Sequence, residues 1–188
     1  MAGALIKVSN MKKYREFMVP FSGLKLGKHE FNFEINNTFF ESFEYNEFND
    51  AAIDLEVSLN KSSTMLELVM TANGTVNVYC DVTNEAYNQP INADLDLVVK
   101  FGDEFNDDND EILILPHGDF QVDISHYVYE MLVLAVPLKK VHPGVLDGTL
   151  ESEALKKLDE LHPKEIKESK DKETDPRWDS LKKLLTDK

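Results

Sequence analysis

The sequence predicts an α+β domain in which a mostly antiparallel sheet is covered by one long apolar helix, with a helical C-terminal arm. Several segments between residues 29 and 101 alternate apolar and polar side chains, which predicts half-buried strands. The links between these segments are short, which favours antiparallel neighbours. Residues 120–142 form the most apolar stretch of the chain and predict the covering helix. The sequence leaves open whether the sheet curls toward a barrel.

The covering helix is predicted to run from Asp123 to Val136. Asp123 suits the N-cap, because its carboxylate can accept a hydrogen bond from one of the first unpaired backbone N–H groups. Pro137 lacks an N–H and disfavours helical geometry at the residue before it, so the helix should end there. Apolar residues lie at three- and four-residue spacing, and others widen that face: Ile124, Tyr127, Val128, Met131, Leu132 and Ala135, with Val133, Leu134 and Val136. We therefore expect this helix to be buried on most sides.

Strands are expected at residues 4–8, 14–19, 29–35, 51–59, 65–70, 75–82, 91–101 and 112–115. Asn36 or Asn37 is expected to cap a short helix that continues to Tyr45. Asn73-Gly74 predicts a two-residue hairpin turn, because both residues accept the positive φ angles that such a turn needs. Residues 102–111 are dense in acids and predict a solvated loop, since the glycine and the distal glutamate of an EF-hand are missing.

Two domains are predicted: an α+β core over residues 1–146, and a charged linker with a helical tail over residues 147–188. A helix is expected at 149–161 and a polar linker at 163–174. Asp175 and Pro176 suit the start of a last helix. Trp178 is the only tryptophan in the chain. The tail either folds back to bury Trp178, or presents Asp175, Arg177 and Trp178 as an anchor for a partner.

The formal net charge of −15 is unevenly distributed along the chain. Residues 1–30 carry a net charge of +4, residues 31–138 carry −19, and residues 139–188 carry none. Nonspecific nucleic-acid binding depends on Lys and Arg, so the acidic middle argues against a generic phosphate-binding surface. An acidic middle between more basic ends instead suits a basic partner, or an RNA contact restricted to the basic segments.

The sequence contains no motif that specifies an enzyme, a metal site or a cofactor. There is no P-loop, GxGxxG, GxSxG or HExxH motif, and the five histidines have no recognisable ligand spacing. Cys80 is the only cysteine, so no intrachain disulfide can form, which fits a reducing compartment. No signal peptide and no membrane-spanning run are apparent. We therefore expect a cytoplasmic, non-enzymatic protein without a cofactor. A hydrolase with unrecognised carboxylates is a minor alternative.

Three stretches occur in a distinctive order: VNVYCDVTNEAY, then DISHYVYEMLVLAVPLKKVHP after an acidic loop, then a terminal DPRWDSLKKLL. In this combination the chain resembles the bacterial YceD-like proteins, the large ribosomal RNA subunit accumulation family, over residues 50–185. Cys80 matches the first cysteine of the family's C-x-R-C motif, while Val82 and Thr83 replace its Arg and second Cys. Val141-His142-Pro143 stands where many members carry further cysteines. Other motif positions are Asp123, Glu130 and Pro137. The chain thus resembles a divergent member without most of the family cysteines.

The resemblance implies a non-enzymatic accessory role in the accumulation or processing of large-subunit ribosomal RNA and in ribosome assembly. The implied partner is precursor large-subunit rRNA or a basic ribosomal or assembly protein. Charge restricts any RNA contact to the basic residues Lys7, Lys12, Lys13, Arg15, Lys25, Lys28, Lys139 and Lys140. The alternative is an acidic adaptor for a basic partner unrelated to ribosomes.

Overall fold

The computed structural model describes residues 15–109 and 111–161. The chain divides into two compact units, residues 1–150 and residues 151–188. The strand predicted at 4–8, the linker at 163–174 and the last helix lie outside the described residues. In the second unit, the described element is α5 (Glu153–Leu161), which is shorter than the helix predicted at 149–161. The domain boundary predicted between residues 146 and 147 stays a prediction.

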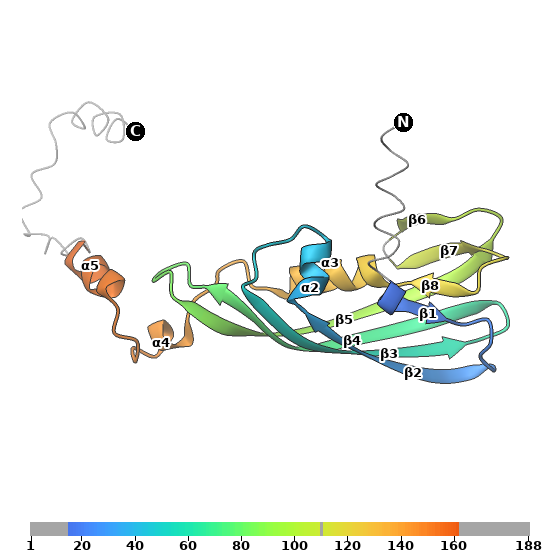
Figure 1. Cartoon of the computed structure of the whole chain (residues 1–188), viewed down its shortest axis with the longest axis horizontal. Coiled ribbons are helices and arrows are strands. Elements are labelled where there is room, and N and C mark those ends of the chain that lie inside the picture. Colours follow the sequence, from blue (N-terminus) through green and yellow to red (C-terminus); the bar gives the residue numbers. More distant parts are fainter. Residues whose placement is uncertain (1–14, 110, 162–188) are drawn as a thin grey trace, which may run out of the picture. The chain divides into compact units, whose positions relative to one another are not determined.

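A six-stranded sheet dominates the first unit (Figure 1). Its strands lie in the order β2-β3-β4-β5-β7-β6. All neighbours are antiparallel except β5 and β7, which run parallel. A separate two-stranded sheet pairs β1 with β8. The bounds are β1 Met18–Pro20, β2 Gly27–Asn36, β3 Asp50–Lys61, β4 Met65–Tyr79, β5 Ala86–Gly102, β6 Asn106–Asn109, β7 Ile112–Pro116 and β8 Gln121–Asp123.

The alternating residues produce a sheet with one covered face and one exposed face. In β3 every second residue from Ala51 to Leu59 is buried, and the residues between them are exposed or half-buried. The same alternation continues in β4, where Leu66, Leu68 and Met70 are at most 1% exposed. Side chains of a strand point alternately to opposite faces, so the sequence pattern directly sets which residues enter the core.

Short helices and aromatic side chains cover the buried face. These elements are η1 (Arg15–Phe17), α2 (Asn37–Ser42) and α3 (Ser125–Ala135). The Phe17 ring stacks on Phe33 of β2 with 5.4 Å between the ring centroids. Phe43, just after α2, stacks on Tyr129 of α3 at 4.3 Å, which links the two helices. Of the two predicted caps, Asn36 caps α2, since its Oδ1 accepts a hydrogen bond from the Thr38 N–H at 3.0 Å, and the helix ends at Ser42 rather than at Tyr45.

The structure is α+β, but the predicted architecture, a mostly antiparallel and possibly barrel-like sheet covered by one long apolar helix, is wrong. The sheet is mixed and open, with β2 and β6 at its edges. The helix α3 has 11 residues and is about 16 Å long, whereas the 15 residues of β4 extend over about 50 Å. α3 contacts β5 and leaves Leu134 83% exposed. An apolar sequence on all sides of a helix does not say how many sides the fold covers.

The hairpin predicted at Asn73-Gly74 is also wrong. Both residues lie in the middle of β4, which pairs continuously with β3 and β5. Gly74 serves a different purpose here: a Cβ at this position would lie 2.6 Å from the Ile53 Cα and would clash with the Ala52 carbonyl oxygen. The glycine is required by the close approach of two backbones rather than by a turn.

The acidic stretch predicted as a loop contains a short edge strand. Residues Asn106–Asn109 form β6, which pairs with β7, and all four residues are exposed. After α3 the chain forms one further helical turn, α4 (Pro143–Leu146). Within the described part of the chain, no helix combines the length and the apolarity needed to cross a membrane.

Candidate functional site

The exposed face of strands β2 to β5 is strongly acidic. In β2, β3 and β5 the residues with even numbers point away from the core, because they alternate with the buried positions. In β4 the parity is reversed and the odd positions point outward. Eight carboxylates and two lysines lie on this face, which we call the acidic face: Glu30, Glu34, Asp50, Asp54, Glu56, Glu67, Asp94 and Asp96, with Lys28 and Lys100.

Strand register brings some of these carboxylates next to each other. Glu34 of β2 lies directly opposite Asp54 of β3, and like charges in such a position are destabilising. Among the described residues, the one ion pair on the acidic face joins Lys28 to Glu30 at 3.1 Å. Amide side chains extend the polar surface, because Asn77 links Asn49 and Asn88 by hydrogen bonds of 3.0 Å and 2.7 Å. A fold that keeps uncompensated carboxylates together presents a surface suited to a cationic partner.

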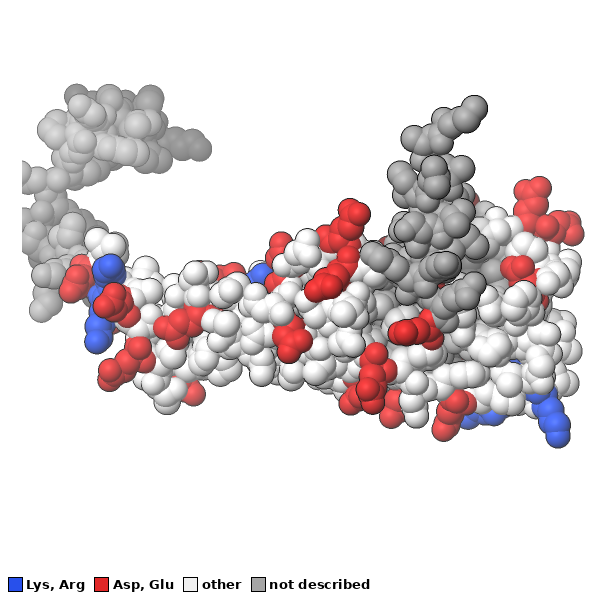
Figure 2. All heavy atoms as spheres, viewed as in Figure 1, with Lys and Arg blue, Asp and Glu red and all other residues white. Residues whose placement is uncertain are grey.

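The basic residues predicted to contact RNA do not form one described surface. Lys7, Lys12 and Lys13 lie outside the described residues, and Arg15 begins η1. Lys25 and Lys139 are exposed. Figure 2 shows lysine and arginine atoms only in small groups, whereas aspartate and glutamate atoms recur along the first unit. The predicted RNA contact stays a prediction.

Lys140 has a structural environment that the sequence did not reveal. Its Nζ lies 3.6 Å from a Glu47 carboxylate oxygen, and its backbone N–H donates to Asp81 Oδ2 at 2.7 Å. The Asp81 N–H in turn donates to the Lys140 carbonyl oxygen at 2.7 Å. The two backbone hydrogen bonds hold the segment after α3 against the turn after β4. The Lys140 ammonium is itself paired with the Glu47 carboxylate.

The structure brings together two segments that the family resemblance singled out. Cys80 follows β4 and is 2% exposed. Its Sγ accepts hydrogen bonds from the backbone N–H groups of Val82 at 3.4 Å and of His142 at 3.3 Å. The His142 ring packs edge-on against Tyr87 at 5.3 Å, and its Nδ1 accepts from the Gly144 N–H at 2.9 Å. The C-x-R-C position and the segment after Pro137 are therefore neighbours in space.

These contacts alter the titration of the two buried groups beside this junction. Burial raises the pKa of the Cys80 thiol, but the hydrogen bonds from His142, Thr83 and Val82 outweigh burial and bring the pKa below its usual value. Burial raises the pKa of Tyr87, and the nearby Cys80 and Asp81 raise it further. The junction therefore favours the thiolate of Cys80 and the neutral phenol of Tyr87.

Residues able to hold a metal ion do not gather in the described part of the chain, where no group of three His, Cys, Asp or Glu side chains has suitable geometry. At the Cys80 junction, the replacements at Val82, Thr83 and Val141 leave one sulfur and one imidazole, and the His142 Nδ1 is already an acceptor. A closed zinc site needs four ligands. The residues present at this junction do not fit a structural zinc ion.

The remaining motif positions have local structural contacts. Asp123 was predicted to be the N-cap of α3, but the helix begins at Ser125 and its N-cap is Ile124, which makes no side-chain capping bond. Asp123 ends β8, and its Oδ1 accepts hydrogen bonds from the Ser125 N–H at 2.9 Å and from the Ser125 hydroxyl at 2.6 Å. Glu130 lies 3.0 Å from the His126 Nε2 one helical turn earlier. Pro137 is exposed just beyond the end of α3. Asp175, Arg177 and Trp178 lie outside the described residues, so the predicted partner anchor stays a prediction.

Residues 68–185 match the model of a family described as large ribosomal RNA subunit accumulation protein YceD. This match spans more than half of the chain. The chain belongs to the YceD family. No curated protein and no solved structure gives a match. The resemblance inferred from the sequence is thereby confirmed, and the YceD match includes the Cys80 junction, β5 and α3.

Proposed function

We propose that this YceD protein is a non-enzymatic accessory factor in the accumulation of large-subunit ribosomal RNA, and that it holds a basic ribosomal or assembly protein on its acidic face. The family description supports the pathway. The proposed contact rests on the acidic face itself, which has eight carboxylates and only two lysines. A basic ribosomal protein needs shielding from nonspecific contacts until it meets its RNA, and a surface of carboxylates supplies that shielding.

Electrostatics favours a protein partner over direct RNA contact by the described residues. RNA binding gains most of its affinity when Lys and Arg displace counterions from phosphates. Of the described lysines predicted for this role, Lys28 and Lys140 are paired with carboxylates at 3.1 Å and 3.6 Å. The acidic face would repel a phosphate backbone over the Debye length of about 8 Å at physiological salt. The alternative within the same function is direct contact with RNA by the N-terminal basic residues Lys7, Lys12, Lys13 and Arg15.

A sucrose gradient tests the pathway. A lysate is fractionated with and without ribonuclease, and the chain is detected in each fraction. We expect co-migration with particles lighter than the mature large subunit, and loss of that co-migration after ribonuclease treatment. A chain found only at the top of the gradient, with normal precursor rRNA in a deletion strain, would contradict the proposal and favour an adaptor unrelated to ribosomes.

Two charge-reversal variants separate protein contact from RNA contact in the same gradient. Asp54→Lys with Glu56→Lys reverses the centre of the acidic face, and Lys12→Glu with Lys13→Glu and Arg15→Glu reverses the N-terminal basic cluster. We expect the first variant to lose most of its co-migration and the second to keep it. The opposite result would assign the contact to RNA and to the N-terminal basic residues.

A further inference from the structure

The strand β5 changes its surroundings half-way along its length. It pairs with β7 only from Val98 to Gly102, so residues 86–97 form an edge of the six-stranded sheet. On the other side, β5 pairs with β4 from Ala86 to Lys100 without a register shift. A strand edge without a partner offers a row of N–H and C=O groups to another extended chain.

The outward-facing backbone groups of this edge follow from two observations. The Val98 N–H donates to the Glu111 carbonyl oxygen at 2.9 Å, so residue 98 directs its backbone toward the β7 side. Alternate residues of a regular strand direct their backbone to the same side, which selects Asp96, Asp94, Asn92 and Pro90. Pro90 agrees with this assignment, because a proline within a strand is tolerated where its missing N–H faces an edge.

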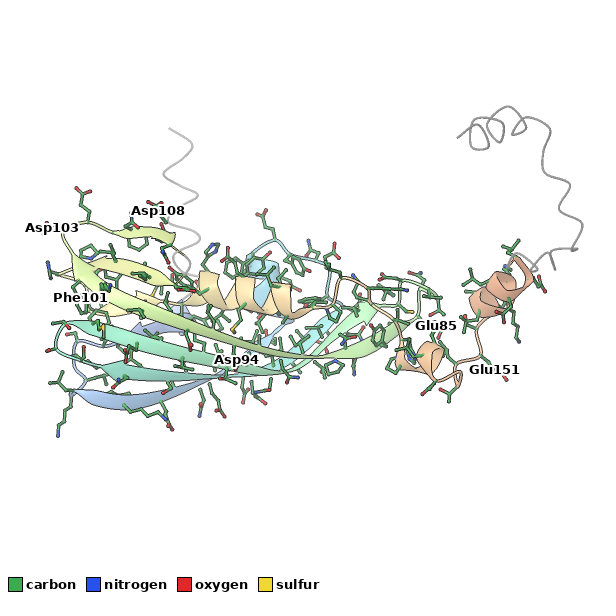
Figure 3. The ribbon with its side chains drawn as sticks, turned by 180° about the vertical axis from the view of Figure 1, so that it is seen from behind. Glu85, Asp94, Phe101, Asp103, Asp108 and Glu151 are labelled. Carbon is green, nitrogen blue, oxygen red and sulfur yellow. The ribbon has the colours of Figure 1, made fainter. Side chains whose placement is uncertain are left out.

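Beside this edge lies a groove of about 690 Å³ between β5 and α3. That volume is within the range of about 300–1,000 Å³ typical of binding clefts. In Figure 3, β5, on which Asp94 is labelled, runs alongside α3. The α3 wall includes Leu134, which is 83% exposed, and the β5 wall includes the half-buried Leu95. The α3 side of the groove is thus mostly apolar, apart from Glu130, which is paired with His126. Asp94 makes the sheet side acidic, and Asp96 follows two residues later on the same face of β5.

We propose that this groove binds an extended segment of the basic partner, which adds as a strand to the β5 edge with alternating basic and apolar side chains. Side chains of an added strand point alternately to the two faces of the sheet. On one face they meet Asp94 and Asp96, which favours Lys or Arg; on the other they meet the α3 wall, which favours Val, Ile or Leu. The inference rests on the proposed function for the identity of its partner. A second copy of this chain is disfavoured, because its own edge carries the same two carboxylates.

The test uses the full chain and a fluorescein-labelled heptapeptide of alternating lysine and valine, with binding followed by fluorescence anisotropy. A control peptide with the same sequence and charge carries an N-methyl group on every backbone nitrogen, so that it cannot donate a strand hydrogen bond from either edge. We expect the unmodified peptide to bind at least about tenfold more tightly, which corresponds to about 1.4 kcal/mol. Equal affinities would overturn strand addition.

Variants of the protein locate the binding site. Asn92→Pro removes one outward-facing N–H. Residue 92 directs its backbone to the same side of β5 as Pro90, so the fold should tolerate a proline there. Asp94→Lys with Asp96→Lys reverses the edge charge. We expect each to weaken binding by about tenfold or more, while Asp103→Lys with Glu104→Lys, the same charge change in the exposed segment after β5, weakens it less than about threefold. Unchanged affinity in Asn92→Pro, or an equal loss in the Asp103→Lys, Glu104→Lys variant, would overturn the proposal.

Two further readouts keep the outcomes apart. Circular dichroism and the unfolding midpoint show whether Asn92→Pro is folded. Sedimentation of the isolated protein tests self-association, and a dimer that disappears in Asn92→Pro would assign the edge to a second copy and overturn the basic partner. If the wild-type chain binds the peptide in an Asn92-dependent way but does not co-migrate with ribosomal precursors, the proposed function fails and the groove stands. If it co-migrates but Asn92→Pro binds the peptide normally, the groove alone fails.

Discussion

The covered face and the acidic face of the same strands differ in what their residues contribute. On the covered face, Leu55 and Leu68 are at most 1% exposed and pack into one continuous core. Their sequence neighbours Asp54 and Val69 point to solvent. Successive side chains of a strand point to opposite faces of the sheet. Residues that stabilise the core therefore alternate along each strand with exposed residues that are available for binding. Substitutions on the two faces should therefore affect different measurements.

The largest expected effect comes from shortening a buried side chain. Leu68→Ala removes apolar contacts and leaves a cavity in the core, which should lower the free energy of unfolding by about 2–5 kcal/mol. Val69→Ala, one residue later on the exposed face, should change it by less than about 1 kcal/mol. Urea unfolding measures both. Equal losses in the two variants would contradict the division between the faces.

A second effect tests the close approach of two strands on which both faces depend. Gly74→Ala forces a Cβ against the Ala52 carbonyl oxygen and the Ile53 Cα, and β3 or β4 must shift. We expect a loss of about 1–3 kcal/mol in the free energy of unfolding. Gly23→Ala is the matched control, because its Cβ would meet no atom within 4 Å. A Gly74→Ala variant as stable as the control would show that this backbone approach is not required.

A smaller effect of opposite sign is expected on the acidic face. Asp54→Asn removes one of two carboxylates directly opposite each other, so the free energy of unfolding should rise by about 0.2–1 kcal/mol at low salt. The gain should shrink at 1 M salt, where the Debye length is about 3 Å. Glu56→Gln is the control, because Glu56 lies opposite Asn32 and Thr71. A gain that does not depend on salt would argue against repulsion between Glu34 and Asp54.

The smallest effect concerns pH and Cys80. The folded state favours its thiolate, because hydrogen bonds from His142, Thr83 and Val82 outweigh the effect of burial on the pKa. The thiolate should therefore add stability as pH rises through the lowered pKa, completely above the unfolded value near 9.0, and lose it as pH falls. The difference in unfolding free energy between wild type and Cys80→Ala should increase from about pH 7 to about pH 9. A difference that stays constant or falls over this range would refute the lowered pKa.

Local patterns predicted most strands of this fold, because β2, β3 and β5 alternate apolar and polar residues and β7 is a short apolar run. These local patterns gave wrong predictions where contacts between elements distant in the sequence determine the structure. Asn73-Gly74 has the composition of a turn, yet the close approach of β3 requires the glycine. The apolar sequence around Leu134 predicts burial on most sides, yet α3 has a neighbour only on part of its surface.

The candidate site was predictable only in part. The net charge of −19 over residues 31–138 indicated an acidic surface, but only the sheet register shows which carboxylates share a face. Pro90 could not indicate the edge of β5, because the strand was predicted to begin at residue 91, whereas β5 begins at Ala86 and includes Pro90. The contact between Cys80 and His142 joins residues 62 positions apart, which no local pattern reveals.

The most direct measurement of the central claim is the ratio of large-subunit to small-subunit rRNA in a deletion strain that expresses variants of this chain. Asp54→Lys with Glu56→Lys reverses the acidic face, and Asp103→Lys with Glu104→Lys makes the same charge change in the exposed segment between β5 and β6. At equal protein levels, we expect the first variant to leave the ratio as low as in the deletion strain and the second to restore it. Full restoration by both variants would contradict the claim that the acidic face carries the function.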